Sequence, residues 1–116
     1  MKKIFCVLIL LFLSINNCFA DYSGNHGINN LYTTKDGQVS LGFNTQPTNT
    51  CNFYGWYIIF DASIAGGKNM LSILLAAKAS SKSVNIWYTA STASGTNQNT
   101  GCNESSMAKL DGVAIP

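Results

Sequence analysis

Residues 51–90 read CNFYGWYIIF, then DASIAGGKNMLSILLAAKASSK, then SVNIWYTA, and this stretch decides the fold. The first segment is rich in aromatic and β-branched residues, which favour strands. The second contains a run of strong helix formers, and the third again alternates as a strand does. The stretch therefore predicts a strand, a helix and a second strand in succession.

The first of these segments, residues 51–60, has β-favouring residues on both of its faces. Alternate positions place Phe53, Tyr57 and Ile59 on one face, and Tyr54, Trp56, Ile58 and Phe60 on the other. A strand that is apolar on both faces is either covered twice within its own chain or faces another subunit.

The helix is predicted over residues 68–79, where apolar side chains recur at helical spacing. Asp61 or Ser63 is expected to cap its start, and the pair Gly66-Gly67 to loosen its first turn. Three further residues widen the apolar stripe: Ile73, Ala76 and Ala77. We therefore expect the helix to be covered on more than one side.

Strands are also expected on either side of this stretch. Residues 28–34 and 38–44 flank Lys35-Asp36-Gly37, a tight-turn signal, and residues 38–44 alternate apolar with polar. Residues 107–115 can supply a last strand. Residues 21–27 are rich in Gly and Asn and are expected to form an irregular lead-in.

The expected fold is mostly β with one helix, in the order β-β-β-α-β-β. Five strands with a helix between the third and fourth is the order of the OB-fold, a five-stranded Greek-key barrel. A small open α+β sheet is the alternative. The length of residues 21–116 predicts a single domain with a modest core.

The first twenty residues have the features of a secretory signal peptide. Lys2 and Lys3 give a positive start, residues 4–13 are apolar, and Cys18-Phe19-Ala20 resembles a cleavage site. The apolar run is much shorter than the roughly 20 residues that a membrane span requires. We expect cleavage after Ala20 and a secreted or periplasmic location in a bacterium.

Cys51 and Cys102 are the cysteines that remain after residue 20. In an oxidising compartment such a pair most simply forms one disulfide. A catalytic thiol would require a histidine partner, and His26 is the chain's only histidine. This composition offers no recognisable zinc-ligand spacing, so no metal site is predicted.

Charge and motifs exclude several classes of function. Residues 21–116 carry five lysines against five acidic residues, and the chain has no arginine. A neutral chain without arginine lacks the basic surface that binds nucleic acid. Neither G-x-S-x-G nor a phosphate-binding loop occurs. We expect neither an enzyme nor a cofactor.

The chain resembles the B subunits of bacterial AB-type toxins, with the subtilase cytotoxin and pertussis-like branch most similar. The resemblance lies in the pattern of SIAGGKNMLSILLAAKASSK running into SVNIWYTAS, and in the C-terminal GVAIP. It implies an OB-fold, a homopentamer, binding to cell-surface glycans and a separate A subunit. No sugar-contacting residue of that family can be matched to a position here.

Candidate glycan-binding residues come instead from aromatic side chains next to neutral polar groups. Such rings have an apolar face and, in Tyr and Trp, a polar handle. The candidates are Trp87 with Asn85 and Thr89 on one strand face, the adjacent Tyr88, and Tyr54 with Trp56. These aromatics could equally belong to the core or to a subunit interface. Residues 91–103 could supply amides and hydroxyls, or be merely solvated.

Two other classes of function fit the same sequence. One is a secreted protein-interaction module or inhibitor that presents its aromatic surface to a protein and has no glycan ligand. The other is a small exported structural protein without a soluble ligand. Oligomeric mass distinguishes the ring-forming subunit from both.

Overall fold

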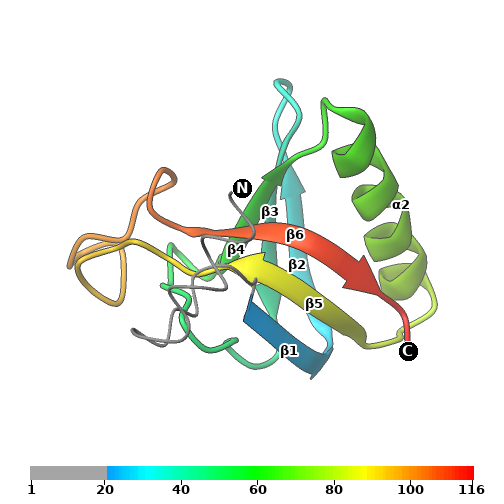
Figure 1. Ribbon diagram of the computed structural model, residues 1–116, viewed down its shortest axis with the longest axis horizontal. Helices are drawn as coiled ribbons and strands as arrows, with labels where there is room; N and C mark the ends of the chain where they lie inside the picture. Colours follow the sequence, from blue (N-terminus) through cyan, green and yellow to red (C-terminus); the bar gives the residue numbers. More distant parts are fainter. Residues whose placement is uncertain (1–20) are drawn as a thin grey trace, which may run out of the picture.

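A computed structural model describes residues 21–116, so the predicted signal peptide, residues 1–20, lies outside the described residues. The described chain has six strands and one helix (Figure 1). They are β1 (Asp21–His26), β2 (Ile28–Thr33), β3 (Gln38–Phe43), β4 (Ile58–Asp61), α2 (Ala65–Ala79), β5 (Val84–Thr89) and β6 (Ala108–Ala114). The expectation of a mostly β fold with one helix is confirmed.

The six strands form one sheet in the order β1-β5-β6-β4-β3-β2. Only the central pair, β4 and β6, is parallel, and every other neighbouring pair is antiparallel. α2 follows β4 and lies along one side of the sheet, whereas the connection between β5 and β6 extends away on the other (Figure 1). β1 and β2, which only Gly27 separates in the chain, are the two end strands of this order.

The expected strand count of five was wrong, because residues 21–27 are not an irregular lead-in. Most of them form β1, whose register opposes Tyr22 to Trp87 and Ser23 to Ile86 of β5. The ladder is irregular between Ser23 and His26, where Asn25 adopts a φ of 60°. A Gly- and Asn-rich segment has little intrinsic strand preference, so pairing with β5 is what makes it a strand.

The strand expected over residues 51–60 is much shorter in the structure. Only its end belongs to β4, and the residues before it form a tight turn in which Tyr54 and Gly55 have positive φ angles of 54° and 91°. Positive φ at two successive residues reverses the chain, so the two-faced apolar pattern does not correspond to a straight strand.

α2 packs one face against the sheet and leaves other apolar side chains exposed. Gly67, Leu74 and Ala77 are buried, while Ile73 and Leu75 are 36% and 50% exposed. The expectation that the helix is covered on more than one side is wrong for the single chain.

The start of α2 is also not capped as expected. Its N-cap position is Ile64, which makes no side-chain cap hydrogen bond. The Asp61 carboxylate instead accepts hydrogen bonds from the Ser63 N–H at 2.8 Å and from the Ser63 hydroxyl at 2.6 Å. These bonds stabilise the ionised carboxylate and lower the pKa of Asp61.

Two groups of buried side chains hold the fold together. The larger lies between the sheet and α2 and includes Leu41, Ile58, Leu74, Ile86 and Tyr88. The smaller is built around the disulfide, on the side of β4 away from the main core. Its members are Cys51, Ile59, Cys102 and Met107, with Phe53, Trp56 and Ala93 packed against them.

Candidate functional site

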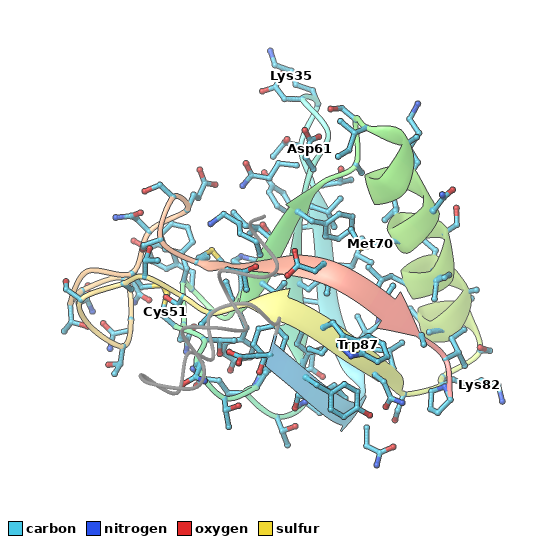
Figure 2. The ribbon with its side chains drawn as sticks, in the orientation of Figure 1. Lys35, Cys51, Asp61, Met70, Lys82 and Trp87 are labelled. Atoms are coloured by element: carbon cyan, nitrogen blue, oxygen red, sulfur yellow. A yellow bond between two sulfur atoms is a disulfide. The ribbon has the colours of Figure 1, made fainter. Side chains whose placement is uncertain are left out.

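The residues proposed from the sequence fall on two separate surfaces and one core position. Trp87 with Asn85 and Thr89 lies on β5, whereas Tyr54 and Trp56 lie in the turn before β4. We call the first group, together with Tyr22, the strand surface. Figure 2 shows Trp87 on β5 and Cys51, the residue that leads into the turn, on a different part of the molecule.

The strand surface is centred on Trp87, which lies on the outward face of β5 with Asn85 and Thr89. Along β5, Val84, Ile86 and Tyr88 are fully buried, whereas Trp87 between them is 38% exposed. Successive side chains of a strand point to opposite faces of the sheet. Because Val84, Ile86 and Tyr88 point into the core, Asn85, Trp87 and Thr89 must point outward.

A cross-strand row of three residues supports the Trp87 ring. Tyr22 of β1 lies directly opposite Trp87, which in turn lies opposite Gly112 of β6. The Tyr22 and Trp87 ring centroids are 5.0 Å apart at an interplanar angle of 50°, and Tyr22 is 53% exposed. A Cβ at Gly112 would lie 3.6 Å from the indole, so the Trp87 ring rests over bare backbone.

Neutral polar groups lie beside this aromatic pair. The Asn85 side-chain oxygen accepts a hydrogen bond from the Asn25 N–H at 3.2 Å, which orients its amide. At the other end of β5, the Thr89 hydroxyl donates to the Asp111 carboxylate at 2.8 Å. The strand surface therefore combines two partly exposed rings with an amide and a hydroxyl held in place by their neighbours.

Tyr88 does not belong to the surface. It is fully buried, and its hydroxyl donates a 2.6 Å hydrogen bond to the Thr48 carbonyl oxygen. Burial raises the pKa of this hydroxyl, so it remains a neutral donor. The alternation that turns Trp87 outward turns Tyr88 inward, which removes it from the candidate ligand-binding residues.

Tyr54 and Trp56 lie in a hairpin-like turn that presents further rings. Phe53 and Trp56 exchange both of their backbone hydrogen bonds, each at 2.9 Å, so Tyr54 occupies the tip and is 69% exposed. Trp56 is partly buried, and its ring centroid lies 5.7 Å from that of Tyr32 on β2, which is 52% exposed. We call Tyr32, Phe53, Tyr54 and Trp56 the hairpin surface.

Sequence reasoning missed Tyr22 and Tyr32, one on each surface. Tyr22 was placed in an irregular segment, and only its pairing with Trp87 shows that it faces outward. Tyr32 lies within a correctly expected strand, but β2 does not alternate in burial, because Tyr32 and Thr33 are both exposed after the half-buried Leu31. A period of two therefore does not identify Tyr32 as a surface residue.

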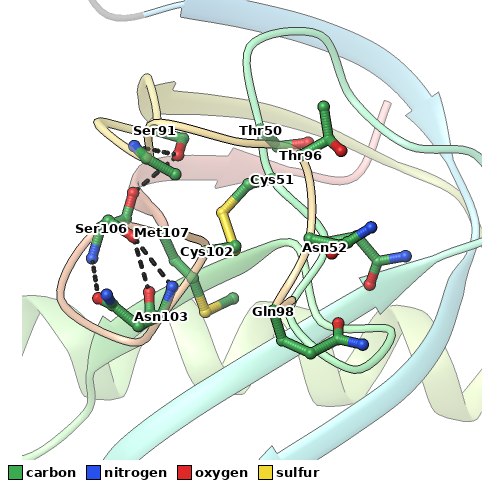
Figure 3. The surroundings of a disulfide bond; sticks show 12 residues. Thr50, Cys51, Asn52, Ser91, Thr96, Gln98, Cys102, Asn103, Ser106 and Met107 are labelled. Atoms are coloured by element: carbon green, nitrogen blue, oxygen red, sulfur yellow. Dashed lines mark hydrogen bonds between the residues drawn. A yellow bond between two sulfur atoms is a disulfide. The ribbon is translucent and has the colours of Figure 1, made fainter. Parts of the chain in front are cut away.

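The predicted disulfide is confirmed: Cys51 and Cys102 are bonded, with their Cα atoms 5.9 Å apart (Figure 3). It joins the turn before β4 to the polar loop of residues 91–103. Side chains of this loop bind its own backbone, because the Thr100 hydroxyl accepts from the N–H groups of Thr96 and Asn97 at 2.9 and 3.0 Å. These groups serve the loop's own fold.

Two cavities lie apart from the strand surface and the hairpin surface. One of about 310 Å³ is lined by Asp36, Gln38, Ile59, Phe60, Asp61 and Lys109. Lys109 donates a 2.6 Å hydrogen bond to the Met107 carbonyl oxygen, and burial lowers its pKa. The other, of about 240 Å³, is lined mainly by polar groups at the end of α2. Among residues 21–116, no three His, Cys, Asp or Glu side chains are grouped to hold a metal ion.

Comparison with protein-family models and with curated proteins finds no match to this chain. Within residues 21–116, α2 is too short and too polar to cross a membrane.

Proposed function

We propose that the protein is a secreted subunit that binds cell-surface glycans and resembles the pentameric B subunit of an AB-type toxin. The observation that carries this proposal is the strand surface, where Trp87 and Tyr22 present exposed rings beside Asn85 and Thr89. Each pyranose has a C–H face that packs on an aromatic ring and hydroxyl groups that bind amides and hydroxyls. Amphipathic rings suit such a half-wet contact.

The proposed fold is an OB barrel in which β1 and β2 act as one long, bent strand. Only Gly27 separates them, β1 pairs with β5, and β2 pairs with β3. Counted in this way, five strands remain, with the single parallel pair β4 and β6 and the helix between the third and fourth strands. Joining the two ends of the sheet order would close the barrel.

The proposed assembly is a homo-oligomeric ring, a pentamer in the resemblance, that accompanies a separate A subunit. Successive helical residues are about 100° apart, so Ile73 and Leu75 lie on opposite flanks of the buried Leu74. Two different apolar flanks on one helix fit a heterologous contact, in which one flank meets the other flank of the next subunit. Such contacts close into a ring when the rotation from one subunit to the next divides a full turn evenly.

The alternative is a secreted protein-interaction module, and the same exposed flanks of α2 favour it. An apolar helix face can receive a different protein as readily as a second copy. The disulfide is compatible with either secreted protein. Glycan binding distinguishes the two.

The test is a glycan array probed with oxidised residues 21–116 and with Trp87→Ala. We expect the wild type to bind a subset of glycans and Trp87→Ala to lose most of the signal. Ile64→Ala is the control, because Ile64 is 59% exposed and lies before α2, away from β5. Unchanged binding by Trp87→Ala would exclude the strand surface as the site. An array on which the wild type binds no glycan would favour the protein-interaction module.

A further inference from the structure

The turn of the hairpin surface holds an exposed aromatic residue in an unfavourable backbone conformation. Tyr54 has a φ of 54° and is 69% exposed. A left-handed conformation is sterically unfavourable for a residue with a Cβ, and it is usually occupied by Gly, Asn or Asp. The exposed ring contributes little core packing to offset this cost. Strain retained at such a position is a reason to look for a function.

Neighbouring polar groups hold this conformation. The Asn52 side-chain oxygen accepts a hydrogen bond from the Gly55 N–H at 2.6 Å, and the Gln98 side-chain oxygen accepts one from the Tyr54 N–H at 3.2 Å. In addition, the Asn52 N–H donates to the Thr96 carbonyl oxygen at 2.8 Å. Two of these three bonds cross from the turn to the polar loop, so the turn depends on where that loop lies.

The disulfide sets the position of the loop relative to the turn. Cys51 directly precedes Asn52, and the Cys102 N–H donates to the Asn97 carbonyl oxygen at 2.9 Å, next to Gln98 (Figure 3). Trp56 packs against the small cluster that contains the two sulfur atoms. The bond therefore ties together both segments that brace Tyr54.

The resulting surface has the same chemistry as the strand surface. Tyr54 and Tyr32 are 69% and 52% exposed, Trp56 lies against Tyr32, and Phe53 meets the Tyr54 ring edge-on at 4.9 Å. The side chains that hold the turn, Asn52 and Gln98, are neutral amides. An aromatic face beside amides matches an uncharged sugar ring better than an ionic ligand.

We propose that the hairpin surface is a second glycan-binding surface and that the Cys51–Cys102 disulfide assembles it. Each oxidised chain would then bind glycans at two places. A dithiol reductant would transfer two electrons and two protons to the disulfide, so that Cys51 and Cys102 become thiols and the dithiol becomes a disulfide. This would release the loop from the turn and abolish binding at the hairpin surface, whereas the strand surface, which contains neither cysteine, would continue to bind. This inference rests on the proposed glycan-binding function. Two linked sites raise avidity on a glycan-covered membrane, and a reducing compartment would lower it.

The two surfaces can be observed separately, because the chain has two tryptophans and each surface contains one. Residues 21–116 are labelled with fluorotryptophan and titrated with lactose, N-acetyllactosamine and sialyllactose while fluorine NMR is recorded. In the oxidised protein we expect saccharide to shift both resonances. After reduction we expect the Trp87 resonance to remain responsive and the Trp56 resonance to become unresponsive. The persistent Trp87 response also shows that the reduced chain is folded.

Tyr54→Asn is the variant that separates the ring from the fold. Asn tolerates the left-handed conformation, so the turn and disulfide are retained while the exposed ring is removed. We expect saccharide binding at the Trp56 reporter to weaken about five- to tenfold, as loss of one aromatic contact implies, with no change at Trp87. Tyr22→Ser should weaken saccharide binding at the Trp87 reporter and leave binding at Trp56 unchanged.

The outcomes distinguish this inference from the proposed function. A shift at Trp87 alone in the oxidised protein would overturn the second surface and leave the proposed function intact. A shift at Trp56 that survives reduction would overturn the role of the disulfide. A Trp56 resonance that responds to protein concentration instead of saccharide would identify a contact with a second copy. If no saccharide shifts either resonance, the proposed function and the inference both fail.

Discussion

His26 is the chain's only histidine and is the last residue of β1, separated from β2 by Gly27. It is buried, and its two ring nitrogens are hydrogen-bonded to the hydroxyls of Ser23 at 2.6 Å and Thr45 at 3.1 Å. Its ring packs against Phe43 at a centroid distance of 5.4 Å. Burial lowers the pKa of His26, and a hydrogen bond at Thr45 opposes this in part.

This lowered pKa predicts that the protein loses stability in mild acid. The unfolded chain takes up the proton near the ordinary histidine pKa of about 6.5, and the folded chain only at lower pH. The stability is therefore fully present above that value and is lost as the pH falls through the lowered folded pKa. We expect the urea midpoint to fall between about pH 7 and about pH 5, where histidine titrates. The pH dependence of the urea midpoint should be smaller in His26→Gln. Equal midpoints of the wild type at the two pH values would contradict this prediction.

The corrected position of Tyr88 gives a second prediction at the residue scale. Removing its hydroxyl in Tyr88→Phe deletes the 2.6 Å bond to Thr48. We expect a loss of about 1 kcal/mol in the free energy of unfolding, the usual net value of one hydrogen bond, with no change in glycan binding. Tyr22→Phe is the matched control, because the Tyr22 side chain is 53% exposed and its stability should not change. A binding defect in Tyr88→Phe would restore Tyr88 to the site.

At the scale of single elements, the adjacent glycines of α2 have opposite roles. A Cβ at Gly67 would lie 1.8 Å from the Asp61 carbonyl oxygen, whereas a Cβ at Gly66 would meet nothing within 4 Å. Gly67 is therefore required for the close approach of α2 to the end of β4. Gly66 only lowers helix stability.

Thermal and urea unfolding of two alanine variants tests this difference. We expect Gly66→Ala to stabilise the protein by about 0.5–1 kcal/mol, the usual gain for glycine to alanine within a helix. Gly67→Ala should destabilise it by about 1–3 kcal/mol, as overpacking against backbone does. Equal effects of the two variants would show that α2 can shift away from β4 at little cost.

Elements whose pattern agrees with their tertiary environment could be predicted from the sequence. β5 alternates cleanly, and the helix formers of α2 set its end at Ala79. β3 alternates in sequence and is a strand as expected, but it is buried on both faces, Ser40 included. β1 and the turn before β4 could not be predicted in this way. β1 is a strand because of its partner β5, and the turn at Tyr54 depends on bonds to Gln98, more than forty residues later in the chain.

The part of the candidate site that lies on β5 could be predicted from the sequence, and its partners on other strands could not. Trp87, Asn85 and Thr89 lie on one face because a strand has a period of two, and the pattern indicated this directly. Tyr88 was included only because it is adjacent in sequence, and the same period excludes it. Tyr22 packs against Trp87, and Tyr32 packs against Trp56, but both tyrosines lie on other strands. A local sequence pattern does not predict which strands pair.

At the scale of the whole molecule, the exposed apolar residues of α2 are the feature that the single chain does not explain. Ile73 and Leu75 flank the buried stripe at 36% and 50% exposure. If a neighbouring copy covers each flank, a charge at either position would lie in an apolar contact and disrupt assembly.

Light scattering after size exclusion tests this on oxidised residues 21–116. We expect a mass of several chains for the wild type, five if the resemblance holds, and a monomer for Ile73→Glu and for Leu75→Glu. Asn99→Glu is the control, because Asn99 is exposed in the polar loop of residues 91–103, which extends away from α2, and the change should leave the mass unchanged. A monomeric wild type would exclude the ring. The apolar flanks of α2 would then be the surface to test against a different protein, while the two aromatic surfaces would remain available to glycans on a single chain.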